Sequence, residues 1–165
     1  MVIRLTGAEL IDDNEARLKA LVSHWAKAEN YAPETAWNQL VDLATEPENR
    51  HTGFYQNFVW VDFDESLIIR GYAAVRTAPL GLELLQEWTE QKNNMDFYRE
   101  IDGLLDKVSE QTGLPVVIVS RRAVSGFIAA ERIYGKRGFE RIGVVYARPP
   151  KVAGVNVPRE TVEVG

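Results

Sequence analysis

Two apolar segments joined by a short polar turn constrain the fold of this chain more than any other feature. Residues 58–63 (FVWVDF) and 67–77 (LIIRGYAAVRT) are rich in β-branched and aromatic residues, and they flank Asp64, Glu65 and Ser66. Such segments form strands, and a connection this short joins neighbouring strands that run in opposite directions. The pattern therefore predicts a β-hairpin within a sheet that is at least partly antiparallel.

The segment after Pro79 extends that sheet. Residues 80–88 (LGLELLQEW) predict a third strand, but the alternation of apolar and polar residues slips at Leu84 and Leu85. One extra residue in a strand shifts the alternation in this way, so we expect a β-bulge at these two leucines.

The remaining segments add helices and a strand of a different character. Apolar residues recur at helical spacing around residues 18–25 and within 31–44, 96–113 and 125–138. Residues 114–120 (LPVVIVS) are an almost entirely apolar run, which predicts a strand buried on both faces over Val116 to Val119. Residues 1–7 and 141–148 predict the first and last strands.

The resulting element order is β-α-α-β-β-β-α-β-α-β. It predicts an α/β (α+β) fold: one domain over residues 1–148, with a mixed, mostly antiparallel sheet and helices on both faces. Residues 149–165 begin with two prolines and are largely polar, so we expect a C-terminal extension that adds nothing to the core.

Composition excludes several classes of function. The chain has 165 residues, with 19 basic and 24 acidic side chains and a net charge of −5, so nucleic acid is not an expected partner. It contains no cysteine and two histidines, His24 and His51, which do not have the spacing of metal ligands. No apolar run is long enough to span a membrane, and the first residues lack a signal-peptide pattern. We expect a protein of the cytoplasm, or of a virus particle assembled there.

A family resemblance is carried by the order of elements together with residues 129–140 (AAERIYGKRGFE), which span the end of the last predicted helix. Residues 130–139 match A-x-x-x-Y-x-x-x-G-F, and the chain to about residue 148 resembles the GNAT N-acetyltransferase superfamily. In active members the tyrosine of this motif lies beside the thioester sulfur and can protonate the leaving thiolate, a role that the resemblance carries over to Tyr134. The alternative is that Tyr134 is an amphipathic aromatic residue that packs its helix.

The same resemblance draws attention to residues 91–96 (QKNNMD). Active members have Q/R-x-x-G-x-G/A here, and the glycines let backbone amides bind the pyrophosphate of acetyl-CoA. Gln91 fits, but Asn94 and Asp96 replace both glycines. We expect Asp96 to cap the following helix and to place its negative charge in the anion site. The sequence therefore predicts little or no binding of acetyl-CoA.

Candidate side chains for chemistry are otherwise few. In active members of the family, a glutamate near the strand that corresponds to residues 80–88 serves as the base. Glu83, Glu87 and Glu90 are available here, and Glu87 is the nominal candidate. Acidic residues that alternate along a strand are also typical of a strand face exposed to solvent. The four tryptophans could line a pocket but are typical core anchors.

Two hypotheses about function follow. The first is a GNAT-fold protein without catalysis that acts as a binding or assembly component, and it resembles the GNAT-like internal virion proteins of bacteriophages. Its tail would contact other protein chains through apolar residues, among them Val155, Val157, Val162 and Val164. The second is an N-acetyltransferase with an atypical phosphate loop, which would use acetyl-CoA as its cofactor.

Overall fold

A computed structural model of the chain describes residues 1–7, 9, 14–45, 57–78, 81–91, 94–118 and 124–141, with side chains in the last range described from residue 129. The chain divides into two compact units, Met1–Arg121 and Arg122–Gly165, and each is considered by itself. No helix in these ranges is long and apolar enough to cross a membrane.

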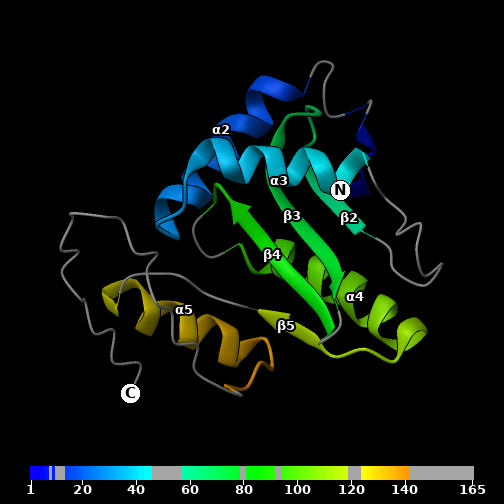
Figure 1. Cartoon of the computed structure of the whole chain (residues 1–165), viewed down its shortest axis with the longest axis vertical. Coiled ribbons are helices and arrows are strands. Elements are labelled where there is room, and N and C mark those ends of the chain that lie inside the picture. Colours follow the sequence, from blue (N-terminus) through cyan, green and yellow to red (C-terminus); the bar gives the residue numbers. More distant parts are fainter. Residues whose placement is uncertain are drawn as a thin grey trace, which may run out of the picture. The chain divides into compact units, whose positions relative to one another are not determined.

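The first unit contains five strands and three helices in its described part (Figure 1). In chain order they are β1 (Val2–Arg4), α2 (Glu15–Ala28), α3 (Pro33–Thr45), β2 (Asn57–Phe63), β3 (Ile69–Ala78), β4 (Gly81–Thr89), α4 (Met95–Thr112) and β5 (Val116–Ile118). The second unit contributes α5 (Val124–Lys136). The strand predicted over 141–148, apart from its first residue, and the whole C-terminal extension lie outside the described residues.

The strands form one sheet in the order β1-β2-β3-β4-β5. The first four are antiparallel neighbours, whereas β5 runs parallel to β4 and pairs with it from Leu82–Val116 to Leu84–Ile118. The predicted mixed, mostly antiparallel sheet is therefore confirmed.

The β2–β3 hairpin closes through one aspartate. The Asp64 carboxylate accepts hydrogen bonds from the backbone amides of Ser66 (2.8 Å) and Ile68 (2.9 Å). Leu67, between them, adopts a left-handed conformation with φ of 60°. The side chain thus satisfies amides that the turn leaves unpaired, which is why the polar residues seen in the sequence mark this turn.

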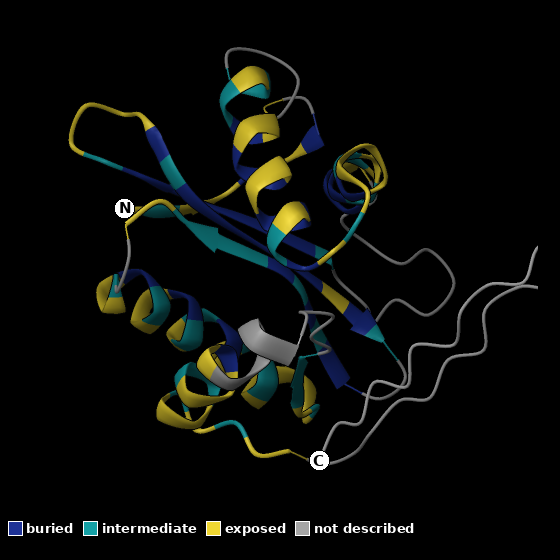
Figure 2. Cartoon of the chain, turned by 90° about the vertical axis from the view of Figure 1, so that its left-hand side faces the viewer, coloured by how far each residue is buried: buried dark blue, intermediate teal, exposed yellow. Residues whose placement is uncertain are grey.

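Helices cover both faces of the sheet, as predicted. On one face, α2 and α3 bury a cluster with Val59, Val61, Ile69, Tyr72 and Ala74. On the other, Phe97, Ile101 and Leu105 of α4 pack against a second cluster, which includes Phe58, Trp60, Ala73, Val75 and Leu84. Figure 2 shows strands that are largely buried, next to helices whose outer sides are exposed.

The predicted bulge is present in β4. Ala74 pairs with Gln86 and Val75 with Leu84, so Leu85 is the extra residue. Because Ala74 belongs to the α2–α3 cluster and Val75 to the α4 cluster, the bulge places Gln86 toward α2 and α3. If Leu84, Leu85 and Gln86 alternated regularly, without a bulge, Gln86 would face α4 as Leu84 does.

The prediction that Val116 to Val119 is fully buried was wrong for the described part of the segment. Val116, Val117 and Ile118 are each half-buried, and residue 119 lies outside the described residues. Among the described strands β5 is the last of the sheet and pairs with β4 alone, while Val116 and Ile118 lie at the margin of the α4 cluster. An apolar run alone does not reveal whether a strand is central or terminal. The sequence also predicts that the last helix packs on this strand through Phe127, Ile128 and Ile133; the side chains of the first two lie outside the described ones, and this packing stays a prediction.

Gly81 provides a test of the β4–β5 register. Its φ is +149°, and a Cβ there would lie 2.3 Å from the carbonyl oxygen of Pro115. We expect Gly81→Ala to lower the free energy of unfolding by about 2 kcal/mol or more, because backbone has to move. Gly103→Ala is the matched control: nothing lies within 4 Å of its Cβ position on α4, and it should stabilise by up to about 1 kcal/mol. Urea unfolding measures both; equal effects would contradict the register.

Candidate functional site

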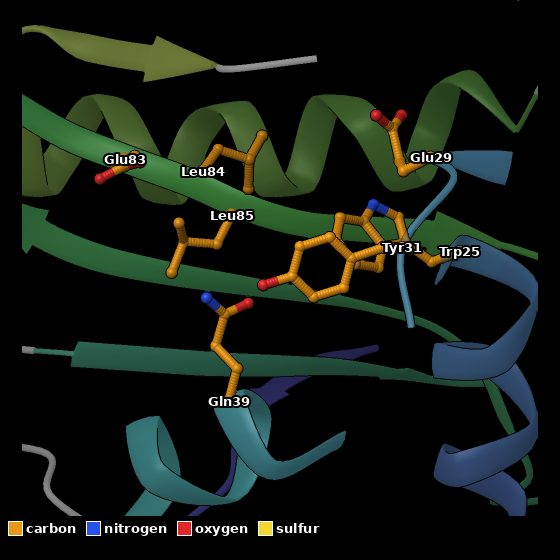
Figure 3. A pocket seen from close by; sticks show the side chains of 7 residues that line it. All are labelled: Trp25, Glu29, Tyr31, Gln39, Glu83, Leu84 and Leu85. Carbon is orange, nitrogen blue, oxygen red and sulfur yellow. The ribbon is translucent and has the colours of Figure 1, made fainter. Parts of the chain in front are cut away.

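A small pocket of about 60 Å³ opens beside the β4 bulge (Figure 3). Its lining comes from α2 and the turn after it, from α3 and from β4, and consists of Trp25, Glu29, Tyr31, Gln39, Glu83, Leu84 and Leu85. Leu85, the extra residue of the bulge, packs against the α2–α3 cluster and forms part of this wall.

The pocket combines acidic and aromatic side chains. Glu29 is only 4% exposed, and Glu83 forms an ion pair with Arg76 at 2.8 Å. The rings of Trp25 and Tyr31 lie 5.6 Å apart and are tilted relative to each other. None of the described lining residues is cationic. The pocket is therefore suited to a positively charged or hydrogen-bond-donating group.

A buried chain of hydrogen bonds lies next to the pocket. The Tyr72 hydroxyl donates to Gln86 Oε1 at 3.0 Å, and Gln86 Nε2 donates to the Ala36 carbonyl at 2.9 Å and to Gln39 Oε1 at 2.8 Å. Gln86 is 1% exposed and Tyr72 fully buried. Burial raises the pKa of the Tyr72 hydroxyl well above its usual value, because the phenolate would lose its hydration.

The three glutamates that the sequence offered as candidate bases lie in different surroundings in the structure. Glu83 lines the pocket. Glu87 pairs with Ala73, a residue of the α4 cluster, and is absent from the described lining. The Glu90 carboxylate binds the guanidinium of Arg17 on α2. The nominal base candidate, Glu87, is therefore not part of this pocket.

Sequence reasoning missed Glu29, Tyr31 and Gln39. One signal was available for Glu29, which follows the last residue of α2. Acidic side chains at this negative end of a helix dipole are unfavourable, so a glutamate there suggests a local requirement. No pattern in the sequence indicates that Tyr31 and Gln39 face the same cavity.

The cap of α4 differs from the prediction. Asn94, not Asp96, is the N-cap: its side-chain oxygen accepts from the Phe97 amide at 3.2 Å, and its amide group lies 3.4 Å from the Thr89 hydroxyl oxygen. Because the helix begins at Met95, Asp96 is the second helical residue; its side chain is 85% exposed and pairs with Arg99 at 3.3 Å. Gln91 is exposed, and its carbonyl accepts from the Asn94 amide.

Tyr134 stands near the end of α5, within a Schellman motif. The Phe139 amide donates to the Tyr134 carbonyl at 3.0 Å, and the Gly138 amide donates to the Gly135 carbonyl at 3.1 Å. Gly138 has the φ of +86° that this helix ending requires. The rings of Tyr134 and Phe139 meet edge to face at 6.2 Å. The Y-x-x-x-G-F spacing therefore fits a Schellman helix ending with a ring contact between Tyr134 and Phe139.

A metal site has no support among the described residues, where no group of three or more His, Asp or Glu side chains could hold an ion.

Comparison with known proteins identifies the fold. No family model and no curated protein matches the chain. Among solved structures, aminoglycoside N-acetyltransferase AAC(6')-Iy in complex with CoA is similar with a TM-score of 0.60 at 8% identity, over 92% of this chain and 95% of that one. An acetyltransferase of the GNAT family from Staphylococcus aureus gives 0.59 at 12% identity, over 93% and 92%.

A third structure is aminoglycoside 6'-N-acetyltransferase AAC(6')-Ih from Acinetobacter baumannii, with a TM-score of 0.57 at 10% identity, over 92% of this chain and 98% of that one. These likenesses show that the chain has the GNAT fold, in agreement with the resemblance found in the sequence.

The raised pKa of Tyr72 predicts a pH effect on stability. Below its usual pKa of 10.0 the Tyr72 hydroxyl is neutral in both the folded and the unfolded state. Above that pH the hydroxyl ionises in the unfolded chain but stays neutral in the folded protein. The wild type therefore loses stability as pH rises. Tyr72→Phe cannot ionise. We expect it to be about 1 kcal/mol less stable than the wild type at neutral pH and to close that gap as pH rises above 10.0. Chemical unfolding of both proteins across this range measures it; a constant gap would contradict the assignment.

Proposed function

We propose that this GNAT-fold chain binds acetyl-CoA weakly or not at all and acts as a binding or assembly component. The observation that carries the proposal is the cap of α4. A pyrophosphate at this position needs free amides at the helix N-terminus, and the Asn94 side chain takes the Phe97 amide.

Asp96 adds an electrostatic obstacle in the same turn. Its exposed carboxylate is partly offset by Arg99, so its effect is smaller than that of a carboxylate that caps the helix. Hydrogen bonds to a charged group contribute about 1.5–3 kcal/mol each. The loss of one amide donor therefore lowers affinity about ten- to a hundred-fold.

Calorimetry with acetyl-CoA tests the proposal. The double variant Asn94→Gly, Asp96→Asn frees the amide and removes the charge, and it should bind about ten-fold tighter than the wild type or better. Glu100→Gln, an equal change of charge one turn further along α4, is the control and should have no effect. Binding by the wild type at about micromolar Kd would overturn the proposal.

The pocket beside the β4 bulge favours a second candidate, an acetyl-CoA-dependent N-acetyltransferase. A negatively charged, partly aromatic cavity suits an amine acceptor, and one similar structure contains CoA. Family resemblance then makes Tyr134 the acid, and Glu87 the nominal base. The pocket residue Glu83 is an alternative base.

Tyr134→Phe separates the two candidates. If the wild type transfers acetyl groups, loss of a general acid should lower kcat about a hundred-fold or more, with acetyl-CoA affinity unchanged. If Tyr134 serves only the helix ending, the variant should keep its Phe139 contact and change stability by about 1 kcal/mol or less. If the wild type is an active enzyme and Tyr134→Phe leaves its kcat unchanged, Tyr134 is not the general acid.

An assembly role also requires a partner surface, and we propose the C-terminal extension, including Val155, Val157, Val162 and Val164. Its apolar residues are spaced by prolines and glycines, a pattern suited to lying across another chain. A particle of a virus assembled in the cytoplasm is the context that the resemblance suggests.

Truncation after Pro150 tests the tail. We expect an unchanged midpoint of thermal unfolding, because the sequence of the tail predicts that it adds nothing to the core, together with loss of co-purification or of incorporation into a larger particle. Sizing and co-purification with the full-length chain as reference measure this. A truncated chain that assembles normally, or that no longer folds, would refute the role.

A further inference from the structure

The outer edge of β1 is not covered by any described strand. β1 comes first in the order of the sheet and pairs with β2. The Leu5 amide donates to the Val59 carbonyl at 2.8 Å, and the Met1 carbonyl accepts from a β2 amide at 2.9 Å. Successive residues of an antiparallel strand turn their backbone groups to opposite sides. The amides and carbonyls of Val2 and Arg4 therefore point away from β2.

These outward groups are available for hydrogen bonding. No described residue bonds to the backbone of Val2 or Arg4 on this side. Further along, the Thr6 amide is already taken by a carboxylate oxygen of Glu9 at 2.8 Å. The edge thus offers the donor and the acceptor of two residues, which is a template for an added strand.

The side chains of β1 present a different character on each face. Ile3 is 39% exposed and lies on the side of the α2–α3 cluster, as Leu5 does. Arg4 lies on the other side, where its guanidinium donates to the Asn57 carbonyl at 2.9 Å and lies 4.4 Å from the centre of the Phe58 ring. That contact uses one of five N–H donors, and no described carboxylate pairs with Arg4. An added strand would meet an apolar residue on one face and a cation on the other.

The C-terminal extension contains one segment with the complementary pattern. Its longest run without glycine or proline is residues 159–164 (RETVEV). Within this run Val162 and Val164 alternate with Thr161 and Glu163. In an extended strand the two valines would lie on one face and the Glu163 carboxylate on the other.

We infer that residues 161–164 of one copy add an antiparallel strand to the β1 edge of a second copy. With Arg4 opposite Glu163, Ile3 lies opposite Val164, so that unlike charges meet on one face and apolar side chains on the other. The inference rests on the proposed function, in which the tail is the partner-binding arm, and it names the surface that the arm meets. Each copy has one edge and one tail, so the contact can repeat from copy to copy.

Reversal of either charge tests the pairing. Arg4→Glu and Glu163→Arg should each weaken self-association of the full chain about five-fold or more, because the opposed side chains then carry like charges. Sedimentation over a range of concentrations measures the association. Lys107→Glu, on the exposed side of α4, and Glu160→Arg, on the other face of the tail segment, are the controls. They make equal changes of charge and should have little effect.

A mixture of the two variants shows whether the contact joins different copies. The Arg4→Glu chain keeps a wild-type tail, and the Glu163→Arg chain keeps a wild-type edge. When they are mixed in equal amounts, each edge finds a tail of opposite charge in the other variant. The mixture should therefore associate about as tightly as the wild type, although each variant alone does not.

Hydrogen exchange distinguishes strand addition from a purely ionic contact. A synthetic peptide of residues 158–165 (PRETVEVG) is added in excess to the full-length Glu163→Arg chain, whose own tail competes weakly. The Val2 and Arg4 amides should then exchange about ten-fold more slowly. The Ile3 amide, which points toward β2, should not change. The same peptide carrying Glu163→Arg should have a much smaller effect.

Four results would overturn the inference: a monomeric wild type, association that survives both charge reversals, a mixture that is no tighter than its components, or Val2 and Arg4 amides that the peptide does not protect. If Arg4→Glu does not fold, the exchange experiment decides, because it does not use that variant. Failure here leaves the tail its role if truncation after Pro150 still abolishes assembly, since the arm then meets another surface. Truncation without effect refutes the proposed role itself.

Discussion

The amide group of Gln86 is the interaction on which the arrangement around the pocket depends. It joins β3 through Tyr72, and α3 through the Ala36 carbonyl and Gln39, from a position that is 1% exposed. It faces those partners because the extra residue Leu85 turns it toward α2 and α3. A buried amide without partners costs about 1–3 kcal/mol, so the bulge and the hydrogen bonds require each other.

This dependence explains how far the sequence could predict the structure. The bulge was visible because Leu84 and Leu85 interrupt a regular alternation. The hairpin was visible because Asp64 stands between two β-rich segments, and Asp64 does accept the amides of the turn. Local patterns such as these are decided by residues that are neighbours in the chain.

The errors came from features that depend on distant parts of the chain or on the exact position of a helix start. An N-cap differs from the second helical residue by two positions, and Asn94 and Asp96 are both good caps, so sequence alone could not choose between them. The pocket combines Glu29, Gln39 and Glu83 from three elements. Their meeting follows from the packing of α2 and α3 on the sheet, which no local pattern specifies.

The two segments that carry the family resemblance, residues 91–96 and 130–139, both lie at helix ends in this chain. Near Tyr134, the spacing to Gly138 and Phe139 fits a Schellman ending with its ring contact. At residue 94, an asparagine side chain caps the helix at a position where the sequence resemblance predicts a glycine. Helix termini can thus be stable with either arrangement, and the choice of residue decides whether their amides are available to a ligand.

The availability of the α4 amides is the central claim, and NMR observes it directly. Backbone amide signals of Met95, Asp96 and Phe97 can be followed while coenzyme A is added to the full chain. We expect the Phe97 signal to stay in place, because its proton is already bound to the Asn94 oxygen. A saturable shift of Phe97 together with its two neighbours would show that a pyrophosphate displaces the cap, and would contradict the account.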